Sequence, residues 1–165
     1  MNKAIFLDRD GVINSDIGLY YVYKPEDFKI NEGIIESLKK FQSADYLLII
    51  ISNQGGIAKG EYSKAEVELV HNKMLSIFAE NGISIKEIYF CPHHSSVEKC
   101  ICRKPDSQML EKAIARFGIN TEVSFFIGDS ERDIKAAKKV KLNALKIDSN
   151  QNISDICIQI ISNLC

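Results

Sequence analysis

The sequence predicts an α/β fold, a three-layer sandwich in which helices cover both faces of a central parallel sheet. Short apolar segments alternate along the chain with segments whose apolar residues recur at helical spacing. Residues 46–51 are apolar throughout, which is typical of a strand covered on both faces. No linker, internal repeat or low-complexity tract divides the 165 residues. We therefore expect residues 1–165 to form one domain without a large cap domain.

The first elements follow from short local patterns. Ala4–Leu7 is an apolar run that ends at an acidic residue, as expected of a buried strand. Residues 16–28 are rich in turn formers and aromatic residues. Glu32–Phe41 then carries apolar residues on one helical face, and Tyr46–Ile51 is the second predicted strand.

The remaining elements continue the alternation. Ser63, with Glu66 three residues later, matches a capping box, so the next helix is expected to run from there to about Gly82. Ile85–Cys91 is the third predicted strand. The later elements are a helix after Pro105 ending near Gly118, a strand Val123–Ile127, a helix Glu131–Lys141, a strand Ala144–Ile147 and a helix Ile153–Leu164.

Composition and charge narrow the class of protein. With 45% hydrophobic residues the chain can bury a full core without disulfides. A formal net charge of -1, with no block of one sign, argues against a nucleic acid or membrane partner. The apolar runs are too short to span a bilayer, and the N-terminus lacks the hydrophobic region of a signal peptide. We expect a soluble, cytoplasmic, monomeric protein.

Polar side chains stand where the predicted strands end. Asp8 and Asp10 follow the first strand, Ser52 the second, Lys104 the loop after the third, and Asp129 the fourth. In a parallel sheet the carboxyl ends of the strands share one edge, and ligands bind there. We therefore expect the site at this edge.

The chemistry of these groups suits phosphoryl transfer. Asp8 can attack phosphorus, and Asp10 can protonate the leaving oxygen and then activate water. Asp-x-Asp-Gly alone is also an ordinary turn sequence, so the other groups matter. Crowded carboxylates around a phosphate need a cation, and an all-oxygen set suits Mg²⁺. Asp129 supplies a further ligand, with Asp133 one helical turn later as support. Ser52, Asn53 and Lys104 can donate to phosphoryl oxygens.

These four segments together resemble the haloacid dehalogenase superfamily of phosphatases. The matching motifs are Asp8-x-Asp10-Gly11-Val12, Ser52-Asn53, Lys104-Pro105 and Gly128-Asp129-x-x-x-Asp133. The resemblance covers residues 3 to about 147 and implies a Rossmann-like fold. It implies that Asp8 is the nucleophile and Asp10 the general acid and base. It also implies that Mg²⁺ is held by Asp8, the Asp10 backbone carbonyl and Asp129.

A cluster of cysteine and histidine suggests a second metal. Cys91, His93, Cys100 and Cys102 lie within a dozen residues, and Cys₃His sets bind structural zinc. His94 could replace His93, and scattered reduced cysteines are the plain alternative. A zinc ion would clip an otherwise irregular loop that ends directly at Arg103 and Lys104, and so hold two cations over a phosphate.

Longer stretches resemble two related groups of phosphatases, those for heptose bisphosphate and those for histidinol phosphate. Asn53–Gly60 is more similar to the heptose enzymes, which serve lipopolysaccharide precursor synthesis. Ser130 stands where those enzymes often have lysine or arginine, a loss that Arg132 or Lys59 could compensate. The substrate contacts expected here are Arg9, Asp16, Gly18, Leu19, Ser52, Asn53, Gln54, Gly55, Arg103, Lys104 and Ser130.

The resemblance implies a phosphoric monoester hydrolase acting on the 7-phosphate of a heptose bisphosphate, a small phosphorylated sugar. Three alternatives stay open: histidinol phosphate as substrate, phosphorylated nucleic acid ends, and a zinc-stabilised binding module without catalysis. The near-neutral charge speaks against the second. The intact set of Asp8, Asp10, Lys104 and Asp129 speaks against the third. His71 is interpreted as a surface or packing residue of its helix, not as a base.

Overall fold

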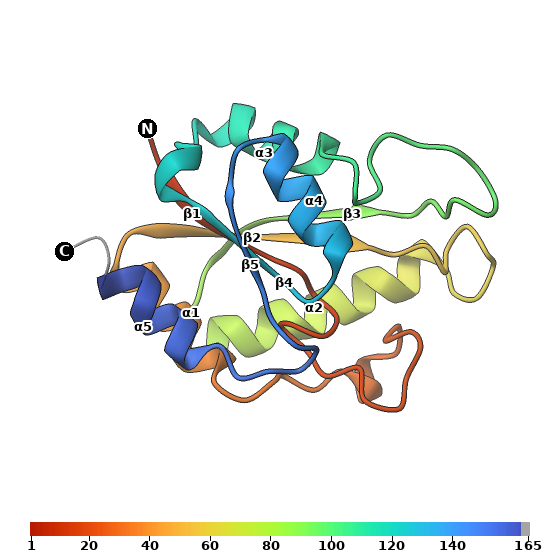
Figure 1. Ribbon diagram of the computed structural model, residues 1–165. Coiled ribbons are helices and arrows are strands. Elements are labelled where there is room, and N and C mark those ends of the chain that lie inside the picture. The colour runs from red at the N-terminus through yellow and green to blue at the C-terminus, as the bar shows by residue number, and fades with distance from the viewer. Residues whose placement is uncertain (163–165) are drawn as a thin grey trace.

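The computed structural model describes residues 1–162 and contains one five-stranded parallel sheet in the order β3-β2-β1-β4-β5 (Figure 1). The strands are β1 (Lys3–Leu7), β2 (Tyr46–Asn53), β3 (Ile85–Cys91), β4 (Phe125–Gly128) and β5 (Asn143–Lys146). Ala4 to Leu7 of β1 are fully buried, as expected for the central strand of a sheet covered on both faces.

Helices cover both faces of the sheet (Figure 1). They are α1 (Ile34–Ser43), α2 (Lys64–Glu80), α3 (Gln108–Phe117), α4 (Glu131–Lys139) and α5 (Ser154–Ser162). The alternating side chains of β1 divide the core: Ile5 and Leu7 pack in a cluster with α1, α2 and α5, whereas Ala4 and Phe6 pack in a cluster with α3 and α4. The predicted three-layer α/β sandwich with a central parallel sheet is confirmed.

Most predicted elements are observed, with shifted ends. The strand expected over Val123–Ile127 begins only at Phe125, because Thr121–Val123 forms a 3-10 turn whose start is capped by the Asn120 side chain. The capping box of Ser63 and Glu66 is present at the start of α2. The last helix is described as far as Ser162, so its predicted end at Leu164 lies outside the described residues.

The register of the sheet brings distant residues together. Leu7, the last residue of β1, pairs with Ile50 on one side and with Ile127 on the other. The residues that follow each of these three therefore meet at one edge. In Figure 1 the loops that leave the carboxyl ends of β1, β2 and β3 lie on this same side of the molecule. Among residues 1–162, no helix is long and apolar enough to cross a membrane.

Candidate active site

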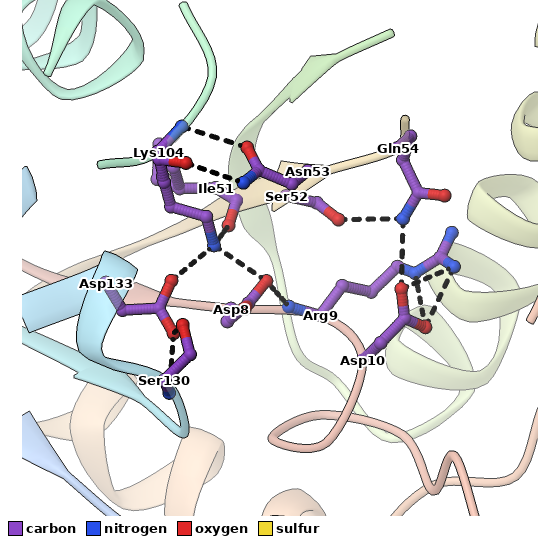
Figure 2. Close-up of polar contacts among 10 residues, drawn as sticks. All are labelled: Asp8, Arg9, Asp10, Ile51, Ser52, Asn53, Gln54, Lys104, Ser130 and Asp133. Atoms are coloured by element: carbon purple, nitrogen blue, oxygen red, sulfur yellow. Dashed lines mark hydrogen bonds and ion pairs between the residues drawn. The ribbon is translucent and has the colours of Figure 1, made fainter. Parts of the chain in front are cut away.

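Lys104 joins two aspartates at the centre of this edge (Figure 2). Its ammonium lies 2.9 Å from Asp8 Oδ1 and 2.7 Å from Asp133 Oδ1, and it donates to the Ile51 carbonyl at 2.8 Å. The side chain is 2% exposed. A buried ammonium with three oxygen partners is fixed in place, so Lys104 offers a positioned charge next to the Asp8 carboxylate.

Asn53 holds the backbone of Lys104. Its amide donates to the Lys104 carbonyl and accepts from the Lys104 N–H, both at 3.0 Å (Figure 2). Both ends of the amide are thereby used within the protein. Asn53 was expected to contact substrate and does line the cavity, but these bonds make it a clamp on Lys104.

The Asp10 carboxylate accepts hydrogen bonds from three side chains. Arg9 donates from Nε and Nη2 at 2.8 to 3.1 Å, and Asn14 donates from Nδ2 at 3.0 Å. Gln54 Nε2 donates to Oδ2 at 3.0 Å (Figure 2). These donors fix the orientation of the carboxylate beside Asp8.

Three carboxylates gather around a single ammonium. Oxygens of Asp8, Asp129 and Asp133 all lie within 4.8 Å of one another. Asp133 is already committed, because Ser130 donates to its Oδ2 from the backbone and from the hydroxyl, at 3.0 and 2.8 Å. Asp8 and Asp129 are left with charge that Lys104 alone does not balance. This donor set fits Mg²⁺, a hard cation that prefers oxygen ligands.

Burial raises the pKa of Asp8 to about 7, with help from the neighbouring Asp133 and Asp10 and against the effect of Lys104. Burial also raises the pKa of Asp129. The pKa of Lys104 is raised as well: burial alone would lower it, but Asp8 and Asp133 outweigh that effect. A divalent cation near Asp8 would favour the ionised carboxylate that a nucleophile needs.

Gly11 is the residue that lets Asp129 approach. Its φ is +79°, a left-handed conformation, and a Cβ at this position would collide with the carboxylate of Asp129 and with Ser149 Oγ. The glycine of the Asp8-x-Asp10-Gly11 motif therefore leaves room for the Asp129 carboxylate beside Asp8.

Cys91, His93, Cys100 and Cys102 form a second cluster at the end of β3. His93 Nδ1 lies 3.2 Å from Cys102 Sγ, and Cys91 Sγ lies 3.7 Å from Cys100 Sγ. The four ligand atoms are within 4.8 Å of one another, which fits a tetrahedral zinc site. His94 is not part of this cluster, since its Nδ1 contacts Ser96 Oγ at 2.7 Å. His93, not His94, is therefore the histidine that lies in this cluster.

The cluster continues directly into Arg103, which reaches back over the loop. Arg103 Nη1 donates to the His93 carbonyl at 3.0 Å. A Cβ on Gly55 would meet Arg103 Nη1 at 2.7 Å, so the glycine allows this close approach. A zinc ion at the cluster would supply rigidity to the segment that carries Arg103 and Lys104.

An open cavity of about 270 Å³ lies above Asp8. Its lining residues are Asp8, Asp10, Asp16, Tyr20, Tyr21, Asn53, Gln54, Gly55, Tyr62, His94, Arg103, Lys104, Asp129, Ser130, Arg132 and Asp133. One side of it is positive: partial burial and the charges of Lys59, Arg103 and Arg132 lower the pKa of His94. A second anionic group of a ligand would find its partners on this side.

Four expected substrate contacts do not line the cavity. Arg9 is fully buried, and its Nη2 donates to the Val22 carbonyl at 2.6 Å, so it supports Asp10 from inside the protein. Ser52 is 1% exposed and lies below the cavity. Gly18 and Leu19 are exposed on the loop after β1 and lie outside the lining. The other predicted contacts, including Asp16 and Ser130, do line it.

Sequence reasoning missed Tyr62. Its hydroxyl donates to Gln54 Oε1 at 2.8 Å, and its ring stacks on Tyr23 with 5.1 Å between centroids. Burial raises the pKa of Tyr62, so the hydroxyl keeps its proton. A tyrosine just before a capping box does not by itself indicate a role in the site. Gly56, which lies against the Tyr62 ring in the structure, is the related sequence feature, because a Cβ there would collide with that ring.

Residues 3–156 match the model of the family described as polynucleotide kinase 3 phosphatase. The D-glycero-beta-D-manno-heptose-1,7-bisphosphate 7-phosphatase of Haemophilus influenzae is 41% identical over 152 residues, which cover 88% of this chain and 82% of the relative. The D-glycero-alpha-D-manno-heptose-1,7-bisphosphate 7-phosphatase of Campylobacter jejuni is 45% identical over 143 residues, covering 87% of this chain and 80% of the relative.

A solved structure shares the fold over nearly the whole chain. It is the D,D-heptose 1,7-bisphosphate phosphatase from B. bronchiseptica, complexed with magnesium and phosphate. It is 25% identical, has a TM-score of 0.88, and the match covers 98% of this chain and 99% of that one.

Proposed function

We propose that this chain, which belongs to the D-glycero-D-manno-heptose-1,7-bisphosphate 7-phosphatase family of the haloacid dehalogenase superfamily, removes the 7-phosphate of that sugar. Over residues 3–156 it also belongs to the family described as polynucleotide kinase 3 phosphatase. It is a phosphoric monoester hydrolase. The observation that carries the proposal is the set at the carboxyl end of β1: Asp8 is 2.9 Å from the buried Lys104 ammonium, and Asp10 is held two residues away.

Asp8 acts first. Its carboxylate attacks the phosphorus of the 7-phosphate, forming an aspartyl-phosphate while the bond to the sugar oxygen breaks. Asp10, in its protonated form, gives its proton to that leaving oxygen. In the second step the Asp10 carboxylate takes a proton from a water molecule, which attacks the aspartyl-phosphate and frees Asp8 as phosphate leaves.

Charge is balanced by groups that do not move. Lys104 offsets the negative charge that develops beside Asp8, and its fixed position means that little reorganisation is needed. Mg²⁺, bound by Asp8, Asp129 and the Asp10 backbone carbonyl, would supply charge neutralisation of the phosphoryl group. Asp133 keeps Lys104 in place from the opposite side.

The positive side of the cavity suits a bisphosphate. Arg132 lines the cavity together with Arg103 and His94, and no ion pair of Arg132 is found among residues 1–162. We infer that Arg132 binds the distal 1-phosphate, with Arg103 beside it.

The experiment that tests the function compares phosphate release from heptose 1,7-bisphosphate in both anomers, histidinol phosphate and a phosphorylated oligonucleotide end, with Mg²⁺. The alternative substrates are included because the named relatives split between the beta and alpha anomers and the matching family model is named for polynucleotides. Preference for a bisphosphate that is lost in Asp8→Asn supports the proposal. Preference for either other substrate overturns the substrate and keeps the chemistry.

We further propose that the protein works as a monomer in the cytoplasm, where a sugar phosphate that cannot cross a membrane is available, and that residues 1–165 form one domain. Its product, a sugar 1-phosphate, suits a reaction in which the phosphate oxygen attacks a nucleoside triphosphate, so that a nucleotidyl group joins the sugar phosphate and pyrophosphate leaves. Size-exclusion chromatography with light scattering would check the monomer, since a dimer mass would contradict it.

A further inference from the structure

Gln54 connects the acid and base residue with the end of β2. The residue is 2% exposed, and its backbone N–H is anchored on the Cys91 carbonyl at 2.8 Å. Its side-chain Nε2 donates to Asp10 Oδ2 at 3.0 Å and to Ser52 Oγ at 2.8 Å (Figure 2). Both hydrogens of the amide are therefore used, one on each partner.

The direction of this amide is fixed by its partners. The Asp10 oxygens act as acceptors here, from Arg9, Asn14 and Gln54, so the NH₂ end of Gln54 faces them. Turning the amide by half a rotation would place its oxygen about 3 Å from the Asp10 carboxylate, without a hydrogen between them. The amide oxygen consequently faces Tyr62, whose hydroxyl must be the donor in their 2.8 Å contact.

Tyr62 is well placed to hold that direction. It is 6% exposed, and its ring lies between Tyr23, stacked at 9°, and Tyr21, edge-on at 5.2 Å. Gly56 makes room for the ring. The next residue, Ser63, caps α2 and accepts from the Glu66 N–H at 3.2 Å, which fixes the backbone at this point.

The Ser52 hydroxyl accepts the second hydrogen bond of the Gln54 amide. Because its Oγ accepts from Gln54, the hydrogen of the hydroxyl is left to donate elsewhere. No hydrogen bond donated by this hydroxyl is found among residues 1–162. Ser52 is 1% exposed and does not line the cavity, so its hydroxyl serves here as a fixed acceptor for the Gln54 amide.

We propose that Tyr62 is a positioning residue for this hydrolysis: its hydroxyl holds the Gln54 amide in the orientation that fixes the Asp10 carboxylate. The inference rests on the proposed phosphatase activity, but not on the identity of the sugar. Tyr62 acts through Gln54 and touches neither the reacting phosphorus nor the leaving oxygen.

The first test is Tyr62→Phe, which removes the hydroxyl and keeps the ring. With an aryl phosphate as substrate, kcat is expected to fall about 5- to 10-fold while KM changes less than about twofold, the size of one lost hydrogen bond in the transition state. Tyr46→Phe is the matched control, since Tyr46 is a buried tyrosine whose hydroxyl has no partner in the described part of the chain. It should keep the wild-type kcat.

Coupling to Gln54 separates positioning from simple packing. Gln54→Met keeps the volume and removes all three hydrogen bonds, so it should lower kcat more than Tyr62→Phe does. If Tyr62 works through Gln54, adding Tyr62→Phe to Gln54→Met leaves kcat unchanged. Additive losses, or a Tyr62→Phe enzyme with wild-type kcat, overturn the proposal.

A measurement that needs no substrate tests the positioning role of Tyr62 separately from the proposed phosphatase activity. In NMR spectra the side-chain NH₂ of Gln54, assigned by its absence from Gln54→Met, should exchange slowly with water in the wild type and at least about 10-fold faster in Tyr62→Phe. Slow exchange in both proteins overturns the positioning role. If the wild-type protein hydrolyses no phosphate ester, the proposed function fails, and the role assigned to Tyr62 in catalysis falls with it even when the exchange rates differ.

Discussion

At the scale of single residues, the site depends on one buried cation between two carboxylates. Lys104 is held by Asp8, Asp133 and the Ile51 carbonyl. Removing one partner of such a buried set leaves the remaining charges without compensation, which is costly, whereas removing an exposed partner is not. The same side chain thus stabilises the folded site and is proposed to act in catalysis.

Lys104→Met tests this double role. We expect kcat/KM to fall by at least about 100-fold, because a fixed charge at the reacting group is lost. The free energy of unfolding should fall by about 3 kcal/mol, since Asp8 and Asp133 are left facing each other. Urea unfolding and phosphate release measure the two effects. Lys139→Met, which removes an exposed ion pair with Asp106, is the control and should change stability by less than about 1 kcal/mol.

Arg132→Ala tests the binding of the distal phosphate. We expect KM for the heptose bisphosphate to rise about 10- to 150-fold, the size of a lost hydrogen bond between charged groups. KM for a monophosphate should stay unchanged, because that substrate lacks the second anion. Lys135→Ala, a cation exposed on the same helix, is the control. An equal rise for both substrates would show that Arg132 does not read the second phosphate.

Residue roles are also where sequence reasoning was weakest. The motifs located Asp8, Asp10, Lys104 and Asp129 correctly at one edge, because strand ends meet there whatever the side chains do. Arg9 was expected to contact substrate, but it is turned inward toward the Val22 carbonyl, a partner 13 residues away that no local pattern reveals.

At the scale of elements, the loop between β3 and α3 links the proposed zinc site to the active site. The loop contains no helix or strand. Its last cluster residue, Cys102, is followed directly by Arg103 and Lys104. Metal binding to such a cluster contributes directly to the stability of the segment that carries the ligands.

Cys102→Ser should release zinc and lower activity. We expect the zinc content to fall from about one ion per chain to near zero, and kcat to fall because Arg103 and Lys104 lose their anchor. Metal analysis and phosphate release check this. Cys157→Ala is the matched control, because Cys157 is buried against Ser37 in the other core cluster and should leave the zinc content unchanged. Full zinc in Cys102→Ser would contradict the assignment.

The elements themselves were largely predictable. The capping box of Ser63 and the continuous apolar run of β2 are local signals, and both are observed. The start of β4 was shifted because Thr121–Val123 forms a 3-10 turn. Local hydrogen bonding competes there with the apolar pattern, and the apolar pattern alone cannot decide between them. Strand order needed the tertiary structure.

At the scale of the whole molecule, the stability of the folded protein should depend on pH through a buried histidine. His71 is 6% exposed and packs edge-on against Phe90. Burial, together with the charge of Arg9, lowers the pKa of His71 to about 4. The sequence predicted a surface or packing residue, and His71 is a packing residue in the structure.

The direction of the change in the free energy of unfolding with pH follows from proton binding at His71. Between about pH 6.5 and 4 the unfolded chain binds a proton at His71 and the folded protein does not, so acid favours unfolding in this range. We expect the free energy of unfolding of the wild type to fall relative to His71→Phe by up to about 3 kcal/mol from pH 7 to pH 4. Between pH 7 and 8 the difference should stay constant. A flat difference below pH 6.5 would contradict the buried, neutral state.

The central claim is that Asp8 attacks the 7-phosphate of heptose 1,7-bisphosphate, and ³¹P NMR of the reaction tests it most directly. The spectrum distinguishes the two phosphates of the substrate and follows each one over time. We predict that the wild-type protein with Mg²⁺ converts the 7-phosphate signal to inorganic phosphate, leaves the 1-phosphate signal intact, and that Asp8→Asn changes neither. Loss of the 1-phosphate first, or turnover that survives in Asp8→Asn, would contradict the claim.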